Sequence, residues 1–329
     1  MFRRIVVVLL VLVSALAATW LAVRRADIPY SRLEVRYTAE TSEFVTLSNG
    51  LITHYTDEGP KDAPVLLLVH GIGSSVATWR SWRANLEDDY RVVAVDLPGH
   101  GLTRVLDSTD LSSAGLADFL GDFADAIGLD RFVLVGSSLG GHAAWLYAVD
   151  ESGAFEGLVL IAASGLPPAP ADTSQSPWVY KLAALRWLHP LLTSLDPEPA
   201  VRAGLESAFV DQGFVTEAAV DQYADLVRAP GHRQAILEIS TRDRAAAGED
   251  AEKLKDLEVS VLILQGQADE IIPPDHARRF HSLLPNSRLK EYPAVGHLPH
   301  EEAPMQTLRD LRAFLATVFT DGHQTGQSD

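Results

Sequence analysis

The chain has 329 residues, of which 47% are hydrophobic and 22% are charged. These proportions are ordinary for a globular protein, and the length allows one large core with a smaller inserted unit. The formal net charge of -17 argues against nucleic acid as a partner, because an acidic surface repels phosphate. The absence of cysteine excludes disulfides, thiolate metal sites and a cysteine nucleophile.

The N-terminal segment, residues 1–25, is predicted to be a separate unit. It contains an uncharged apolar run, Ile5–Val23, with arginine pairs at 3–4 and 24–25. The run is long enough to cross a bilayer as a helix. We expect a transmembrane anchor with the folded domain on the outer, periplasmic side, since a short basic tail tends to stay inside. The alternative is a signal segment cleaved near residues 15–17, which would give a secreted protein.

The next part of the chain alternates between strand and helix patterns. Residues 26–42 are predicted to form a polar linker, and Asn49-Gly50 between two alternating runs predicts a β-hairpin. Short apolar runs typical of buried strands and helix-length segments then follow one another. The strand runs are 65–69, 92–95, 132–135, 158–162 and 261–264, and the helical segments are 77–87, 112–128 and 139–149. This alternation predicts a mostly parallel sheet with helices on both faces.

The alternation stops after Gly165 and resumes near Val259. Between these points comes a proline-rich stretch, followed by helical periodicity without a buried strand. The sequence therefore predicts a helical insertion at 166–247 that divides the core into 43–165 and 248–318. The polar tail, 319–329, is predicted to be disordered.

The strongest chemical signal is Gly136-Ser137-Ser138-Leu139-Gly140, directly after a strand run and before an apolar helix. Gly-x-Ser-x-Gly at such a joint is the nucleophile elbow, in which a tight turn presents the serine hydroxyl. The spacing of the glycines selects Ser138 over Ser137. The following helix aims its N–H groups at the site, which favours a developing oxyanion.

A serine hydroxyl needs a base, and the base needs an orienting carboxylate. His297 follows a short strand-like run and precedes a terminal helix, which makes it the candidate base. Asp269 follows the last buried strand run and is preferred over the adjacent Glu270 as the candidate acid, because parallel strands build sites beyond their carboxyl ends. His300 could be taken for a metal ligand, but no third ligand is near it in the sequence, and we expect no metal and no cofactor.

The turn His70-Gly71-Ile72-Gly73 follows the first buried strand run. Its backbone could present the Ile72 N–H beside the Leu139 N–H, so these two groups are the candidate oxyanion donors. His70 is expected to organise the turn rather than to act as a second base.

These motifs, together with Asp96-Leu97-Pro98-Gly99-His100-Gly101, resemble the successive landmarks of the α/β-hydrolase superfamily over residues 43–318. The resemblance implies an α/β-hydrolase fold with nucleophile Ser138, acid Asp269 and base His297, oxyanion donors Ile72 and Leu139, and a helical lid at 166–247. The serine nucleophile argues against the haloalkane dehalogenase and epoxide hydrolase branches, which use an aspartate there. Thr103 stands where the family usually has a serine.

Within the serine branch, the chain resembles membrane-anchored monoacylglycerol lipases and bacterial lipases or esterases. The expected activity is hydrolysis of small-molecule carboxylic esters with medium or long acyl chains, with Trp178 and Trp187 of the lid contacting the apolar substrate. One alternative is a hydrolase of carbon–carbon bonds in aromatic ring-cleavage products, with an arginine at 186, 202, 228 or 233 binding the substrate carboxylate. Another is a ligand-binding homologue without turnover.

Overall fold

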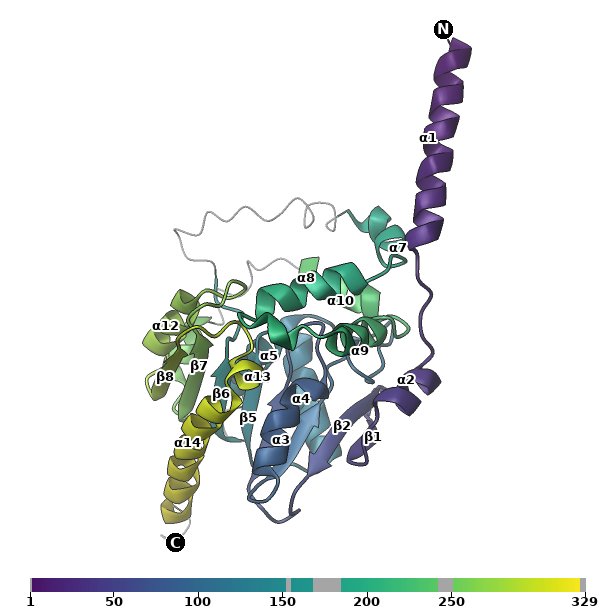
Figure 1. Ribbon diagram of the computed structural model, residues 1–329. Coiled ribbons are helices and arrows are strands. Elements are labelled where there is room, and N and C mark those ends of the chain that lie inside the picture. Colours follow the sequence, from purple (N-terminus) through teal and green to yellow (C-terminus); the bar gives the residue numbers. More distant parts are fainter. Residues whose placement is uncertain (1, 152–154, 168–184, 242–250, 326–329) are drawn as a thin grey trace.

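The computed structural model describes residues 2–151, 155–167, 185–241 and 251–325. Its centre is an eight-stranded sheet in the order β1-β2-β4-β3-β5-β6-β7-β8 (Figure 1). β1 pairs antiparallel with β2, β2 pairs antiparallel with β4, and the other neighbours are parallel. The strands are β1 (Ser42–Thr46), β2 (Ile52–Glu58), β3 (Val65–Val69), β4 (Arg91–Val95), β5 (Phe132–Ser137), β6 (Phe155–Ile161), β7 (Val261–Gly266) and β8 (Ser287–Tyr292). The predicted mostly parallel sheet and the hairpin at Asn49-Gly50 are confirmed.

Alternate residues of the central strands enter two separate cores. Leu67 and Leu134 pack on one face with the apolar sides of α4 (Ser113–Ala126), α5 (Leu139–Asp150) and α12 (Pro274–Leu283). Leu66 and Val135 pack on the other face, where the covering elements are η1 (Val76–Trp79), α3 (Arg80–Leu86) and α14 (Pro304–Thr325). Helices therefore cover both faces, as the unbroken apolar strand runs predict.

A group of helices joins β6 to β7 and lies over the carboxyl ends of the parallel strands (Figure 1). We call its described residues, 185–241, the helical insertion. Its elements are η2 (Arg186–Leu188), α7 (His189–Leu192), α8 (Glu198–Ala208), η3 (Gln212–Phe214), α9 (Glu217–Val227) and α10 (His232–Thr241). Leu205, Phe209 and Val220 of the insertion form an apolar cluster with Leu298 of the core. This cluster packs the insertion against the loop that follows β8.

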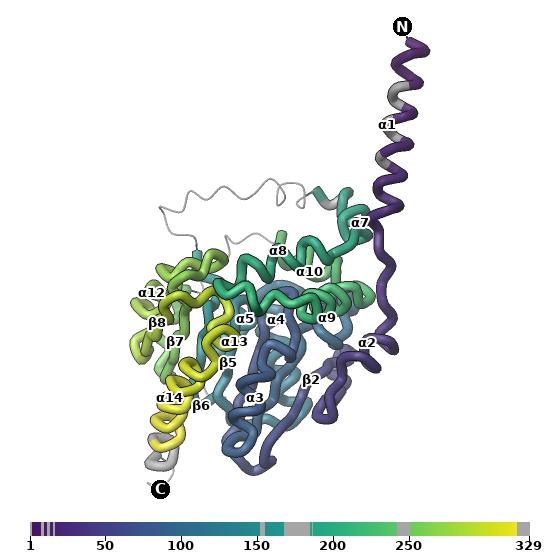
Figure 2. The backbone as a smooth tube through the Cα atoms, viewed as in Figure 1, coloured from purple at the N-terminus to yellow at the C-terminus, as the bar shows by residue number. Residues whose placement is uncertain are grey.

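The N-terminal helix α1 (Phe2–Val23) extends away from the body (Figures 1 and 2). The prediction that it anchors the protein in a membrane is wrong: within the described residues, no helix has both the length and the apolar character needed to span a bilayer. Its last turn is instead bound to the protein, because Trp20 Nε1–H donates to Ser194 Oγ (2.9 Å) and the Asp196 N–H donates to the Val23 carbonyl (2.8 Å). The prediction that the folded domain lies on the outer, periplasmic side is wrong for the same reason, and the structure does not support a signal segment.

Residues 26–42, predicted to be a polar linker, contain a packed helix, α2 (Tyr30–Tyr37). Leu33 is 1% exposed and forms a cluster with Leu102 of the core and Leu226 of the insertion. The cause is the apolar and aromatic side chains spaced through an otherwise polar segment, which bury one side of this short helix. At the other end, α14 continues to Thr325, into the segment predicted to be disordered.

Candidate active site

The candidate nucleophile, Ser138, stands in a strained turn between β5 and α5. Its backbone has φ 52° and ψ -113°, a left-handed conformation that a residue with a Cβ rarely adopts. The other non-glycine residues with positive φ in the described chain, Ala162 and Ala294, follow the carboxyl ends of β6 and β8. Such strain gathers where the surrounding structure fixes a functional geometry.

The glycines around Ser138 allow the close approach that the elbow requires. A Cβ at Gly136 would lie 2.4 Å from the Gly140 carbonyl oxygen, and a Cβ at Gly140 would lie 2.4 Å from the His70 carbonyl oxygen. A side chain at either position would therefore push α5 away from the strands beneath it. Ser138 itself is 7% exposed.

The candidate oxyanion turn lies directly against the serine. A Cβ at Gly71 would be 3.0 Å from Ser138 Cβ and 3.6 Å from Ser138 Oγ. His70 supports the turn, because its Nδ1–H donates to the Gly71 carbonyl (2.7 Å) and its Nε2 accepts from the Leu97 N–H (3.0 Å). Burial lowers the pKa of His70, so the ring stays neutral and organises the turn. The residues offered as oxyanion donors, Ile72 and Leu139, thus follow Gly71 and Ser138 at this contact.

The candidate acid and base are in contact. His297 Nδ1–H donates to Asp269 Oδ2 (2.8 Å), and both residues are 5% exposed. A carboxylate can only accept, so the proton sits on Nδ1 and leaves Nε2 free to act as a base. The Ile271 and Ile272 N–H groups donate to Asp269 Oδ1 (2.8 Å each) and fix the carboxylate plane.

Two residues of this arrangement were not identified from the sequence. Gln265 Nε2–H donates to Asp269 Oδ2 (2.9 Å), so a side chain at the end of β7 also orients the acid. Glu302 contacts the His297 loop. Each residue is close in sequence to the group that it contacts, Gln265 four residues from Asp269 and Glu302 six residues from Gly296, but no sequence pattern shows the turns that bring them together.

Asp269 is hydrogen-bonded to His297, and Gly71 lies close against Ser138. Among the described residues, no hydrogen bond connects Ser138 to His297. Catalytic hydrogen bonds are often long in a protein without substrate. Trp187, a predicted substrate contact, is 76% exposed at the start of the insertion. The other predicted contact, Trp178, lies outside the described residues.

Next to His297, two side chains of α13 (Pro299–Glu302) face a polar cluster under the insertion. Thr78 Oγ1 lies 2.9 Å from His300 Nε2 and donates a short hydrogen bond to Glu301. Burial lowers the pKa of His300 to about 3. Glu301 keeps partial exposure as a residue, but desolvation of its carboxyl raises its pKa to about 7. The His300 ring is therefore neutral at pH 7, and a substantial fraction of the Glu301 carboxyl stays protonated there.

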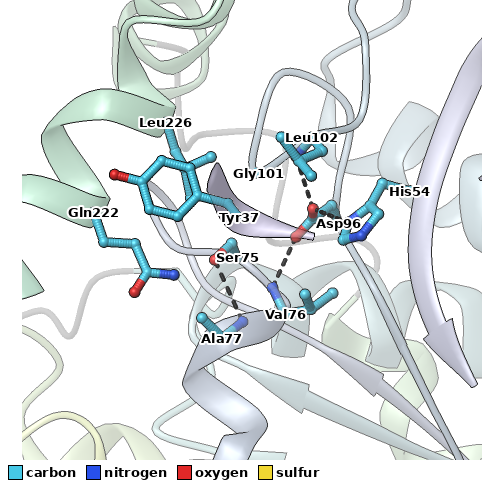
Figure 3. A pocket seen from close by; sticks show the side chains of 10 residues that line it. All are labelled: Tyr37, His54, Ser75, Val76, Ala77, Asp96, Gly101, Leu102, Gln222 and Leu226. Carbon is cyan, nitrogen blue, oxygen red and sulfur yellow. Dashed lines mark hydrogen bonds and ion pairs between the residues drawn. The ribbon is translucent and has the colours of Figure 1, made fainter. Parts of the chain in front are cut away.

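A second aspartate–histidine pair lies at the end of β4, where Asp96 Oδ1 is 3.7 Å from His70 Nε2. His54 Nδ1–H donates to Asp96 Oδ2 (2.6 Å), and the Ser42 hydroxyl lies 2.9 Å from His54 Nε2. Asp96 also accepts the Val76 N–H (2.7 Å) and the Leu102 N–H (2.8 Å), as Figure 3 shows. We call Ser42, His54 and Asp96 the structural triad.

A cavity of about 20 Å³ lies beside the structural triad (Figure 3). Such a volume holds one water molecule and no ester substrate. Burial disfavours the ionised Asp96 carboxyl, but the neighbouring His54 and the donated hydrogen bonds outweigh this and lower its pKa. This site therefore joins the hairpin to the core rather than receiving a substrate.

Comparison with known proteins decides the family. The model of the α/β hydrolase fold matches residues 64–304. The chain belongs to this family. The strained Ser138 turn, the Gly71 turn and the Asp269–His297 pair all lie just beyond the carboxyl ends of strands of this fold.

Similar proteins include hydrolases with two kinds of substrate. The chain is 27% identical over 280 residues to the 2-hydroxy-6-oxo-2,4-heptadienoate hydrolase of Pseudomonas putida, covering 83% of this chain and 95% of that protein. The esterase RhEst1 of a Rhodococcus species matches with a TM-score of 0.66 and 26% identity, over 84% of this chain and 99% of that one. A meta-cleavage product hydrolase of Pseudomonas fluorescens matches with a TM-score of 0.70 and 24% identity, over 84% and 97%, which supports the fold alone. The protein is thus a hydrolase of the α/β fold, and these relatives do not resolve its substrate.

Proposed function

We propose that the protein hydrolyses carboxylic esters with medium or long acyl chains through an acyl-enzyme on Ser138. The observation that carries the proposal is the Asp269–His297 hydrogen bond at the same sheet edge as the strained Ser138 turn. The hydrogen-bonded carboxylate fixes the tautomer in which Nε2 of His297 can accept a proton.

The mechanism has two acyl transfers. Ser138 Oγ attacks the ester carbonyl as His297 Nε2 takes its proton, and the N–H groups of Ile72 and Leu139 stabilise the tetrahedral oxyanion. His297 then gives that proton to the leaving alcohol. A water molecule, deprotonated by His297, attacks the acyl-enzyme, and the proton returns to Ser138 as the acid leaves.

The preference for an apolar acyl chain is supported by the side chains flanking the site. Ile72 of the oxyanion turn is 39% exposed, and Ile271, two residues after Asp269, is 43% exposed. Phe214 of the insertion is 37% exposed and stacks on Phe209, which packs with Leu298, the residue after His297. Apolar surface of this kind near a polar reaction centre is typical of sites that bind hydrophobic ligands.

Carbon–carbon bond hydrolysis is the second candidate, and the ring-cleavage hydrolases among the similar proteins favour it. It requires a cation for the substrate carboxylate. Arg202 pairs with Glu198 and Glu217, Arg228 with Asp225, and Arg233 with Asp27. The side chain of Arg186 lies outside the described residues. Since Arg202 and Arg233 each pair with a carboxylate and Arg228 shares Asp225 with Arg36, we place the ester reaction first.

The test is the hydrolysis of p-nitrophenyl esters from acetate to palmitate by the wild type and Ser138→Ala. We expect turnover that peaks at medium or long chains and falls at least 10³-fold in the variant. Equal turnover by both proteins would contradict the proposal. Fluorophosphonate labelling without ester turnover, together with cleavage of a 2-hydroxy-6-oxo-dienoate, would establish the second candidate instead. A protein that neither labels nor turns over would be the ligand-binding homologue.

A further inference from the structure

Glu302 joins the helical insertion to the loop that carries His297. One carboxylate oxygen, Oε1, accepts the Asp211 N–H (2.7 Å), and the other, Oε2, accepts the Gly296 N–H (2.6 Å). Asp211 precedes η3 in the insertion, and Gly296 is the residue before His297. Both hydrogen bonds end on backbone groups, so this carboxylate fixes the course of the chain on both sides.

The backbone at His297 is also in direct contact with the insertion. The His297 N–H donates to the carbonyl of Ala208, the last residue of α8 (2.7 Å). A Cβ at Gly296 would lie 2.3 Å from that same carbonyl oxygen. The peptides on both sides of Gly296 are therefore held: Glu302 accepts the N–H of the Val295–Gly296 peptide, and the end of α8 accepts the N–H of the Gly296–His297 peptide.

We propose that Glu302 is a positioning residue that couples the seating of the helical insertion to the placement of the His297 imidazole. This inference rests on the proposed function, in which His297 is the base. Glu302 contacts no reacting atom; it acts by holding the Val295–Gly296 peptide, one residue before His297. An imidazole displaced by about an ångström loses much of its catalytic effect, because proton transfer requires hydrogen-bond reach.

The two-sided contact depends on a carboxylate. Its two oxygens can accept both N–H groups at once, whereas a glutamine has one acceptor and would turn its NH₂ toward the second N–H. Glu302→Gln therefore keeps the size of the side chain and removes one of the two anchors. Its matched control is Glu217→Gln, since Glu217 is an exposed carboxylate of the insertion that pairs with Arg202.

The first measurement is kcat and KM with a p-nitrophenyl ester. We expect Glu302→Gln to lower kcat about tenfold with KM changed by less than about twofold, because a charge-assisted hydrogen bond is lost while the acyl-chain contacts remain. Glu217→Gln should match the wild type within about twofold. A Glu302→Gln variant with wild-type kcat would overturn the inference.

The second measurement is a double-mutant cycle with His297→Ala. If Glu302 acts through the imidazole, Glu302→Gln has no further effect on the residual turnover of His297→Ala. A general structural role would instead lower turnover by the same factor in both backgrounds, which would contradict the proposal. The rate of fluorophosphonate labelling gives the same comparison when turnover is too slow to measure.

A third pair of variants tests the insertion side of the contact without changing Glu302. Asp211 has φ -81°, which proline can adopt, so Asp211→Pro removes its N–H with little backbone strain. Asp211→Ala removes the same side chain and keeps the N–H. We expect kcat to be severalfold lower for the proline variant than for the alanine variant, and equal values would overturn the coupling.

Ser138→Ala, assayed beside these variants, distinguishes failure of the positioning role of Glu302 from failure of the proposed function. If Ser138→Ala and His297→Ala are inactive and the Glu302 and Asp211 variants are normal, the positioning role fails and the function stands. If Ser138→Ala keeps full turnover, the proposed function fails and the positioning role fails with it.

Discussion

The molecule contains two aspartate–histidine pairs, each with a serine nearby, and they differ in what surrounds the serine. In the structural triad, Ser42, His54 and Asp96 form a complete hydrogen-bonded chain with contacts of 2.9 and 2.6 Å. In the candidate active site, only the Asp269–His297 contact of 2.8 Å is made, and the Ser138 hydroxyl is not part of it.

The two sites differ in the backbone conformation at the serine. Ser42 begins an edge strand, β1, and its hydroxyl is engaged by the Ala39 N–H (2.9 Å) as well as by His54. Ser138 stands in a left-handed turn at the start of α5, against the Gly71 turn. The first N–H groups of a helix have no intrahelical acceptor and can stabilise an oxyanion, whereas a strand gives no such group.

A complete chain of hydrogen bonds from aspartate through histidine to serine therefore does not by itself mark an active site. A chain of aspartate, histidine and serine also serves to tie a hairpin to a core. We expect the nucleophile to be the serine that a strained turn presents beside backbone N–H donors.

The largest difference in kcat between the two sites should come from replacing the aspartate of each site by asparagine. Asp269→Asn should lower kcat about 10²-fold or more, because the amide no longer fixes the tautomer that leaves Nε2 free. Asp96→Asn should change kcat by less than about threefold. Ester turnover of the two purified variants at one pH checks this, and a comparable loss in both would remove the distinction between the sites.

For the free energy of unfolding, Asp96→Asn should have the larger effect and Asp269→Asn the smaller one. Asp96 is 1% exposed and its carboxylate accepts Val76 N–H, Leu102 N–H and His54 Nδ1–H. Asp96→Asn should therefore lower the free energy of unfolding by about 2–3 kcal/mol, since buried hydrogen-bonded groups lose their partners. Urea denaturation measures this directly. A smaller loss than that of Asp269→Asn would show that the structural triad is not the stabilising one.

A smaller effect should appear in the pH dependence of stability beside the candidate site. Glu301 has a native pKa of about 7, against 4.5 in the unfolded chain. Between these values the native state binds more protons, so its stabilising contribution is full below about pH 4.5 and is lost as the pH rises through 7.

Glu301→Gln should flatten this slope and leave the variant more stable than the wild type at pH 8 by about 1 kcal/mol, allowing for the partial exposure of the residue. Thermal unfolding from pH 5 to 8 gives the result. Glu217→Gln, which changes an exposed carboxylate, should keep the wild-type slope, and an unchanged slope in Glu301→Gln would refute the assignment.

The smallest effect should be that of Ser42→Ala. Its hydroxyl makes hydrogen bonds at a partly exposed position, so its removal should cost about 1 kcal/mol or less of unfolding free energy. Turnover should remain within about twofold of the wild type. A large loss of turnover in Ser42→Ala would give this serine a role that the comparison denies it.

The sequence predicts the sheet and the placing of Ser138, Asp269 and His297 because each signal is local. A run such as 261–264 marks a buried strand, and parallel strands bring their carboxyl ends to one edge. The glycines at 136 and 140, whose spacing selects Ser138 in the sequence, allow the close packing of α5 in the structure.

What the sequence could not show depends on contacts between distant segments. The packing of Leu33 needs Leu226 of the insertion, and the role of Glu302 needs Asp211. The prediction of a membrane anchor from the apolar run at the N-terminus was wrong for a related reason. Hydropathy does not show that Trp20 and Val23 are hydrogen-bonded to the insertion. Trp187 stays a predicted substrate contact, at a position that is largely exposed.

The central claim is that Ser138, and not Ser42, is the nucleophile. The most direct measurement is to label the wild-type protein with a fluorophosphonate, digest it and locate the adduct by mass spectrometry. We expect one adduct, on the peptide that contains Ser138, and none on the peptide that contains Ser42. An adduct on Ser42, or labelling that is unchanged in Ser138→Ala, would contradict it.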